Sequence, residues 1–182
     1  MNSLDLSHYR DSQKVERKKK NEHPPSLKDD AQLKAKLSNL FSFLEDLNNQ
    51  IYQRSLLNLV NKCKTEGVEY LLNITQLDLS HCGLEAIPEE VGLLKNLEEL
   101  TLIDNKLSDL PMSLASLSSL TKVEIETNQF EVIPRVIHEI ATQKIKGKEY
   151  FELYLRDNPM KSVPKALDPV VRSMPHFGST LE

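Results

Sequence analysis

The sequence has 182 residues and a mass of 20.8 kDa, which suits one domain with an appendage. Its net charge of −4 and its pI of about 5.8 provide no general basic field, which disfavours nucleic-acid binding. The chain contains 30 leucines but only 5 Phe, 5 Tyr, 5 Gly and no Trp. This composition indicates a regular aliphatic packing unit, and it disfavours an enzyme with the glycine-rich phosphate turns of nucleotide binding.

Neither a secretion signal nor a membrane span is predicted. The first 20 residues are polar, and no run approaches the roughly 18 apolar residues of a membrane-spanning helix. The two cysteines, Cys63 and Cys82, lack CxxC spacing and histidines at zinc-site intervals, so we expect no metal site and no cofactor. We therefore expect a protein of a reducing cytosol, its own or that of another cell, with no membrane partner.

Residues 1–25 are expected to form a disordered tail, because apolar residues are sparse and Pro24-Pro25 opposes regular structure. The tail carries a charge run at residues 14–20 that includes three consecutive lysines. This run has two interpretations, a nuclear-import or phosphate-binding patch and a solvated flexible arm.

Residues 26–69 are predicted to be helical and to cap the rest of the chain. Ser26 is placed as an N-cap, and a leucine stripe runs from Leu33 to Leu47 at steps of four and three. The stripe then fails, which predicts a kink or turn within residues 48–55. Gly67 is expected to end the second helix. Its apolar face is predicted to contain Tyr52, Leu56, Leu59, Val60 and Cys63.

From residue 74 the chain repeats itself, with units starting at residues 74, 97, 120 and 150. Each unit follows the pattern L-x-x-L-x-L-x-x-N/C-x-L, with other apolar residues in some of the leucine positions. Each unit is also followed by an apolar residue and a proline. These pairs are Ile87-Pro88, Leu110-Pro111, Ile133-Pro134 and Val163-Pro164.

The repeat spacing has physical reasons. The x-L-x-L piece predicts a short strand with alternate residues facing inward, and parallel strands need a return limb on the far side. Asparagine at the bend can bond backbone groups that the turn leaves unpaired. The third unit is longer, and helical spacing at residues 135–146, closed by Gly147, places its excess in a helix of the return limb. The inward pairs are Leu77/Leu79, Leu100/Leu102, Val123/Ile125 and Leu153/Leu155, and the bend positions are Cys82, Asn105, Asn128 and Asn158.

These motifs resemble the leucine-rich repeat family in its intracellular 23-residue form, over about residues 70–171. The repeats look like those of Ras-suppressor and scaffold-type proteins, and like those of effectors from intracellular bacteria such as Legionella. The resemblance implies an α/β solenoid: a short horseshoe with a parallel concave sheet, four repeats, an N-terminal helical cap and a C-terminal tail at residues 172–182. Such repeats need capped ends because a solenoid otherwise exposes its core.

The resemblance also implies a function. Family members bind proteins through the concave face, the sheet face turned away from the return limbs. The residues of this chain assemble no Ser-His-Asp or Cys-His arrangement on one surface. We therefore expect a monomeric, non-enzymatic binding module, acting in the cytosol or, as a secreted effector, in a host cytosol. The alternative is an oligomerising scaffold that uses the Leu33–Leu47 stripe. The predicted partner-binding residues are Asp78, Glu99, Thr101, Ile103, Lys122, Glu124, Glu126, Glu152, Tyr154 and Arg156.

Charge on this face suggests the kind of partner. With the flanking Glu98, Asp104 and Asp157, eight acidic residues stand against two basic ones. This excess predicts a protein partner with a basic patch and opposes nucleic-acid binding. Ile103, Tyr154 and Phe151 are expected to supply apolar anchors. A purely solvated charged face is the plainer interpretation of the same residues.

Overall fold

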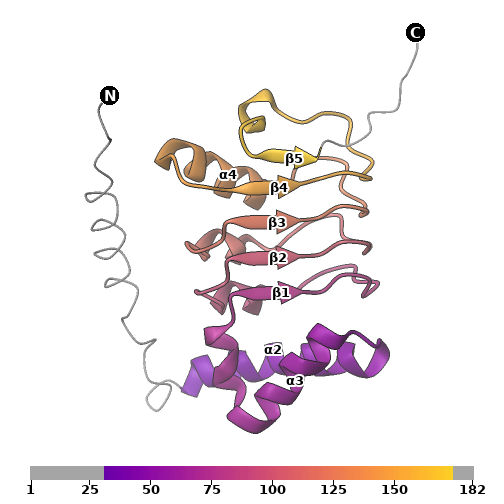
Figure 1. Cartoon of the computed structure of the whole chain (residues 1–182), viewed down its shortest axis with the longest axis vertical. Coiled ribbons are helices and arrows are strands. Elements are labelled where there is room, and N and C mark those ends of the chain that lie inside the picture. The colour runs from indigo at the N-terminus through magenta and orange to yellow at the C-terminus, as the bar shows by residue number, and fades with distance from the viewer. Residues whose placement is uncertain (1–30, 174–182) are drawn as a thin grey trace, which may run out of the picture. The chain divides into compact units, whose positions relative to one another are not determined.

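Five short parallel strands form one sheet in the computed structural model, which describes residues 31–173 (Figure 1). Two helices, α2 (Ala31–Gln50) and α3 (Arg54–Glu66), precede the sheet, and from Gln32 onward the described residues belong to one compact unit. The predicted tail at residues 1–25 and the Ser26 N-cap lie outside the described residues. The strands follow chain order across the sheet: β1 (Gln76–Asp78), β2 (Glu99–Thr101), β3 (Lys122–Glu124), β4 (Glu152–Tyr154) and β5 (Val171–Ser173).

The predicted break between the two N-terminal helices is present at residues 51–53, and Gly67 ends α3 with a φ of 93°. A short 3-10 helix, η2 (Val68–Asn73), follows and packs against α3. The predicted buried face of α3 is correct for Leu56, Val60 and Cys63. It is wrong for Tyr52, which is 86% exposed because it lies in the break between the helices.

The leucine stripe of α2 is buried within the chain itself. Leu37, Leu40 and Leu44 have no exposed surface and Leu47 is 7% exposed. An oligomer assembled through this stripe would need these side chains at the surface. The structure therefore removes the observation on which the oligomerising alternative rests.

The core is built from the inward residues of the strands, as the repeat predicts. Leu77 pairs with Leu100, Leu100 with Val123, and Val123 with Leu153 in the parallel register. All eight predicted inward residues, one within each of the first four strands and one directly after each, are at most 2% exposed. The chain is thus a short α/β solenoid in which each repeat stacks its aliphatic side chains on those of its neighbours.

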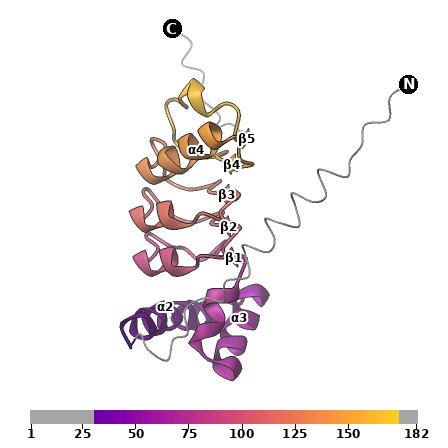
Figure 2. The same ribbon diagram turned by 90° about the vertical axis from the view of Figure 1, so that its left-hand side faces the viewer.

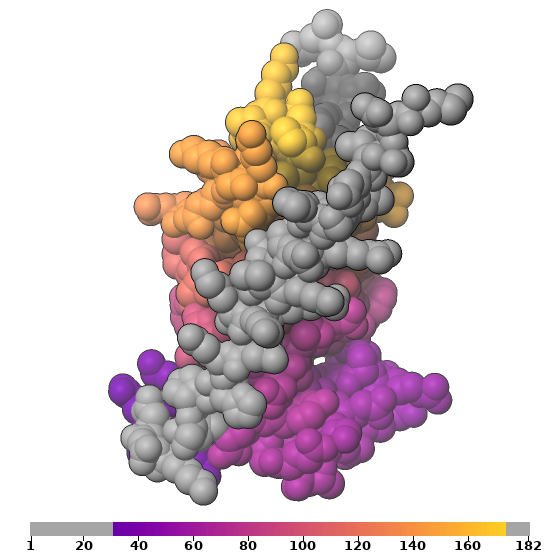
Figure 3. Space-filling view, turned by 60° about the vertical axis from the view of Figure 1, so that its left-hand side comes forward, coloured from indigo at the N-terminus to yellow at the C-terminus, as the bar shows by residue number. Residues whose placement is uncertain are grey.

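The return limbs lie on the side of the stack opposite the strands (Figure 2). Each limb begins after one of the four predicted prolines, which occupy the N-cap, and Pro88, Pro111 and Pro164 are in extended conformation. In the longer third unit, α4 projects beyond the neighbouring limbs (Figure 3). Its C-cap is Lys148 in the left-handed region rather than Gly147, which is the last helical residue. The limbs are η3 (Glu89–Leu93), η4 (Met112–Ser116), α4 (Arg135–Gly147) and η5 (Lys165–Leu167).

The predicted asparagine ladder is present. Asn105 accepts hydrogen bonds at Oδ1 from the backbone N–H groups of Cys82 and Leu84, at 3.1 and 3.0 Å. Its Nδ2 donates to the carbonyls of Leu79 and Leu102 at 2.9 and 3.0 Å. Asn128 and Asn158 make the same kinds of bond one and two repeats further on. Each asparagine therefore fastens its own repeat to the preceding one.

The residue before each ladder position adopts a left-handed backbone. Its φ is 59° at His81, 55° at Asp104, 54° at Thr127 and 58° at Asp157. Aspartate tolerates this region, whereas a β-branched residue such as threonine is strained there. The repeat pattern quoted from the sequence leaves this position unspecified, so the strain at Thr127 is a finding of the structure.

The array extends beyond the predicted boundary. Arg172 and Ser173, assigned from the sequence to a C-terminal tail, belong to β5, which pairs with β4 through a shift in register. The strand lacks the leucine pattern, and this is why the repeat search ends before it. No helix within residues 31–173 is both long and apolar enough to cross a membrane.

Candidate functional site

The outward side chains of the strands form parallel rows across the concave face. One row joins Asp78, Thr101, Glu124 and Tyr154 through the strand register, and the row before it begins with Gln76. Ile103, Glu126 and Arg156 lie two residues beyond the ends of β2, β3 and β4. Of the ten predicted partner-binding residues, nine are half-buried and Arg156 is exposed. The structure thus brings all ten onto one surface.

Tyr154 lies at the centre of a polar network on this surface. The Nζ of Lys122 lies 5.5 Å from the centre of the Tyr154 ring, a cation–π contact, and 3.1 Å from Glu124 Oε1. Thr101 Oγ1 donates to the other oxygen of Glu124 at 2.9 Å. The Tyr154 hydroxyl donates to Glu152 Oε2 at 3.3 Å. Tyr154 is therefore contacted by Lys122 on β3 and by Glu152 on its own strand, and Thr101 on β2 is linked to it only through Glu124 and Lys122.

The fifth strand supplies two further members of the network that the sequence interpretation missed. Arg172 Nε donates to Glu152 Oε1 at 2.9 Å, and Ser173 Oγ donates to Glu126 Oε1 at 2.7 Å. Arg156 lies 3.6 Å from the same oxygen of Glu126. Without β5, neither residue could be assigned to this face.

The network shifts three pKa values. The hydrogen bond from Arg172 is the main reason why the pKa of Glu152 is lowered. Burial, followed by the neighbouring Glu152, raises the pKa of Tyr154. Burial alone would lower the pKa of Lys122, but the hydrogen bond and charge of Glu124 outweigh it, so the pKa is raised. Each shift favours the charge state present at neutral pH.

These contacts correct the charge count made from the sequence. Glu124, Glu126 and Glu152 each pair with a cation on the same face. The other end of the face differs: within residues 31–173, none of the observed ion pairs includes Asp78, Glu98 or Glu99. The acidic groups outside these ion pairs therefore lie on β1 and at the start of β2, where the charge of Glu99 still helps to raise the pKa of Lys122.

One predicted anchor is wrong. Phe151 is only 1% exposed and belongs to the core, because it precedes β4 on its inward side. Ile103 and Tyr154 remain as the half-buried apolar groups of the concave face. The two anchors lie two strands apart, or about 10 Å at the spacing of sheet strands.

The described residues contain no cluster of histidine, cysteine and carboxylate groups suited to a metal ion. Burial is the first cause that raises the pKa values of Cys63 and Cys82 to about 11. Neither thiol is activated as a nucleophile, because a reactive cysteine needs a lowered pKa.

A parallel ladder of leucine-rich units with an asparagine at each bend defines the class of this fold. The family model described as leucine rich repeat matches residues 73–130. The chain is a leucine-rich repeat protein, a family that generally serves protein–protein interaction without catalysis.

Curated relatives share the repeats. The volume-regulated anion channel subunit LRRC8A of Rattus norvegicus is 29% identical over 138 residues, which are 74% of this chain and 16% of that protein. Leucine-rich repeat-containing protein 7 of Rattus norvegicus is 32% identical over 94 residues, which are 50% of this chain and 6% of that protein. The chain thus spans a small part of the length of these relatives. A solved structure of an LRR protein of Leptospira interrogans aligns with a TM-score of 0.40 and 20% identity, covering 58% of this chain and 38% of that one.

Proposed function

We propose that the concave face binds a protein partner, with basic side chains of the partner over β1 and β2 and apolar side chains over Ile103 and Tyr154. The observation that carries this proposal is the uneven charge of the face. Carboxylates near β4 are already neutralised by Lys122, Arg156 and Arg172. Asp78 and Glu98 belong to none of the ion pairs within residues 31–173, and Glu99 has only the electrostatic influence of Lys122, so this end can attract a cation from a partner.

The acidic residues at the β1 and β2 end of the concave face would act mainly on the association rate and on the orientation of the partner. Complementary charge raises association rates and rejects wrong partners more than it adds affinity. Asp78 and Glu99 are half-buried and Glu98 is exposed, so a partner can reach all three. The proposed contact region therefore begins at the N-terminal end of the sheet.

The Tyr154 end would supply most of the binding energy. Tyrosine is enriched among the residues that dominate interfaces, and one that is already ordered costs less entropy to bind. Lys122, Glu124 and Glu152 hold the ring in place before any partner arrives. Tyr154 is therefore the residue whose loss should matter most.

The test starts with a photo-crosslinking amino acid placed in the full chain at Ile103 and, separately, at Lys146, which lies on the exposed side of α4. A protein crosslinked only from position 103 is then titrated by calorimetry. Tyr154→Ala should weaken its binding by about 2 kcal/mol or more. Glu98→Lys combined with Glu99→Lys should slow association and reverse its dependence on salt.

Lys146→Glu is the matched control and should change neither quantity. Lys144 is unsuitable, because it is 8% exposed and donates to Ser118 O and Glu149 Oε2. Unchanged affinity in both concave variants, with loss in the Lys146 variant, would move the site to the return limbs.

A further inference from the structure

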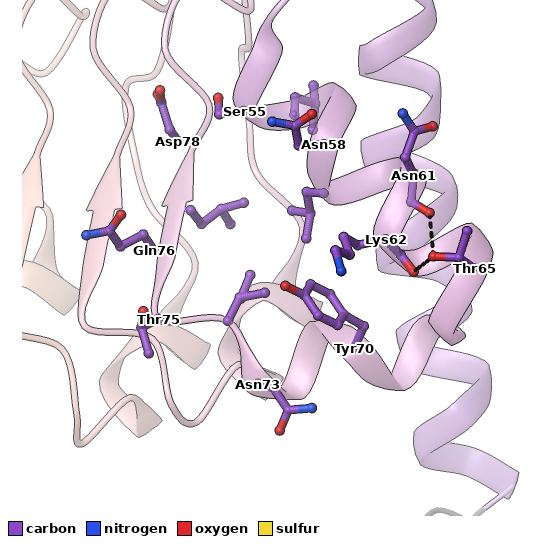
Figure 4. A pocket seen from close by; sticks show the side chains of 14 residues that line it. Ser55, Asn58, Asn61, Lys62, Thr65, Tyr70, Asn73, Thr75, Gln76 and Asp78 are labelled. Atoms are coloured by element: carbon purple, nitrogen blue, oxygen red, sulfur yellow. Dashed lines mark hydrogen bonds between the residues drawn. The ribbon is translucent and has the colours of Figure 1, made fainter.

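A cleft of about 650 Å³ lies between α3 and β1, at the N-terminal edge of the sheet (Figure 4). Its volume is within the usual range of ligand sites. One side is lined by residues from α3, including Ser55, Asn58 and Asn61, and the other by residues 75–78. Successive side chains of a strand point to opposite faces. A cleft that touches four consecutive residues therefore runs along the backbone edge of β1.

The backbone N–H and C=O groups at this edge point outward, as they do in a strand that pairs with a further strand. In β2, Glu99 N donates to Thr75 O at 3.0 Å and Thr101 O accepts from Leu79 N at 2.9 Å, so these positions join each strand to the preceding one. Gln76 and Asp78 occupy the same positions in β1. Within residues 31–173, no strand precedes β1 in the sheet. The N–H and C=O groups of Gln76 and Asp78 consequently face the cleft.

The opposite wall can pair with a strand placed there. Asn58 is an exposed amide on α3, and an amide side chain offers a donor and an acceptor as a peptide group does, whereas the Asn61 side chain points away from β1 (Figure 4). The half-buried Leu59 gives the cleft an apolar part, whereas Leu77 also borders it but is only 2% exposed. An inserted strand would therefore find polar groups at both edges and aliphatic contacts on its inward face.

The charged residues of the cleft determine which side chains an inserted strand can carry on its outward face. Lys62, which also lines the cleft, is paired with Glu66 at 2.7 Å, and its pKa is raised by that contact. Asp78 accepts the backbone N–H of Ser80 at 3.0 Å but is absent from the ion pairs of the described residues. Asp78 is thus the uncompensated charge of the cleft, and it lies on the concave side.

We propose that this cleft binds an extended peptide segment as an added strand on β1, with a lysine or arginine facing Asp78 and the alternate, aliphatic side chains directed toward Leu59. Addition of a strand to a sheet edge is a general mode of peptide recognition in which backbone hydrogen bonds supply affinity. The site shares Asp78 with the acidic end of the proposed concave-face contact but does not include Ile103 or Tyr154, so Tyr154→Ala and Gln76→Pro distinguish the failure of one proposal from the failure of the other.

The probe is a fluorescent, end-capped peptide of three Lys-Val pairs, titrated by anisotropy into the full chain. Hydrogen exchange of the Gln76 and Asp78 amides should be fast in the free protein and slow by at least about 10-fold at saturation. The same peptide N-methylated at alternate backbone nitrogens should bind at least about 10-fold more weakly, because two or more hydrogen bonds are lost. A Glu-Val peptide should bind more weakly than the Lys-Val peptide.

Variants of the protein complete the test. Asp78→Asn keeps an acceptor for Ser80 N and should weaken the Lys-Val peptide but not an uncharged Gln-Val peptide. Gln76→Pro removes one outward N–H and should weaken both, while Tyr154→Ala should weaken neither. Equal affinity for the methylated and unmethylated peptides, or no binding up to about 1 mM, would overturn the proposal. So would protection of the two amides by self-association, detected as a dimer by light scattering without peptide.

Discussion

Arg172 and Glu152 lie on neighbouring strands, and the guanidinium Nε of the first is 2.9 Å from the carboxylate Oε1 of the second. This ion pair connects the last strand of the array to the network that holds Tyr154. It therefore joins the C-terminal end of the array to the proposed binding face.

Arg172→Ala should raise the pKa of Glu152 toward the ordinary value for glutamate, because the main cause of its lowering is removed. Carboxyl chemical shifts followed by NMR would measure this change, with Arg135→Ala on α4 as the control. A lowered pKa stabilises the fold above the unfolded value of about 4.3, and that stability is lost as pH falls through the folded value. The difference in thermal stability between wild type and Arg172→Ala should accordingly shrink below about pH 4. An unchanged Glu152 pKa would contradict the assignment.

Leu102→Ala should lower the free energy of unfolding by about 2–5 kcal/mol. Leu102 is fully buried and belongs to an inner repeat, so the cavity would weaken stacking on both sides. Val132→Ala removes an aliphatic side chain that is 68% exposed and should have little effect. Chemical denaturation of both variants measures the difference, and equal effects would show that burial does not set the cost.

Asn105→Ala should destabilise the protein by about 1–3 kcal/mol, because buried backbone groups of two repeats lose their partners. Asn49→Ala, at an exposed position of α2, is the control and should be nearly neutral. Asn96 is less suitable for this purpose, since its Nδ2 donates to Leu72 O at 2.8 Å. Equal melting temperatures for the Asn105 and Asn49 variants would refute a stabilising ladder.

Thr127→Asn should stabilise the protein by roughly 1 kcal/mol, since asparagine tolerates the left-handed backbone that strains threonine. Thr127 is exposed, so the exchange creates no cavity. Calorimetric melting would detect the gain, and Thr142→Asn, in the ordinary helical backbone of α4, should show none. A lower melting temperature for the Thr127 variant would mean that its φ of 54° costs little.

Cys82 should react slowly with iodoacetamide in the folded protein, and its rate should keep rising with pH up to about 11. Only the thiolate attacks, and burial disfavours the thiolate. Peptide mass spectrometry of the Cys63→Ser variant isolates the signal, with urea-unfolded protein as the reference that levels off near the pKa of a free thiol, about 8.5. A plateau near that pH in the folded protein would contradict the raised pKa.

The strand register and the asparagine ladder could be predicted because the same pattern of residues occurs in several units. Leu77, Leu100 and Asn105 recur at fixed offsets, so each unit supports the assignment of the next. The fifth strand could not be predicted in this way, because residues 171–173 carry no leucine pattern and pair through a shifted register. Because β5 was not predicted, Arg172 was not assigned to the concave face, and the charge balance near Tyr154 was therefore predicted wrongly.

Burial of the helices was harder to predict for a different reason. A leucine stripe shows that a helix has an apolar face but not what covers it, and the stripe of α2 is covered within the chain. Likewise, Phe151 stands just before β4, where the alternation of inward and outward residues begins. The structure is therefore needed to show that its side chain is buried. The cleft beside β1 is formed by two separate elements, α3 and β1, and no local sequence pattern predicts how far apart they lie.

The lengthened limb of the third repeat leaves the strand register intact: Lys122 still pairs with Glu152, and Glu124 with Tyr154. Extra residues are therefore accommodated on the return-limb side of the repeat, while the strand side keeps its spacing. The stretch around Gly147 and Lys148 is exposed and offers a place to graft a fluorophore-binding loop or an affinity handle. Such a graft would report on the protein in cells without altering the spacing of the side-chain rows on the concave face.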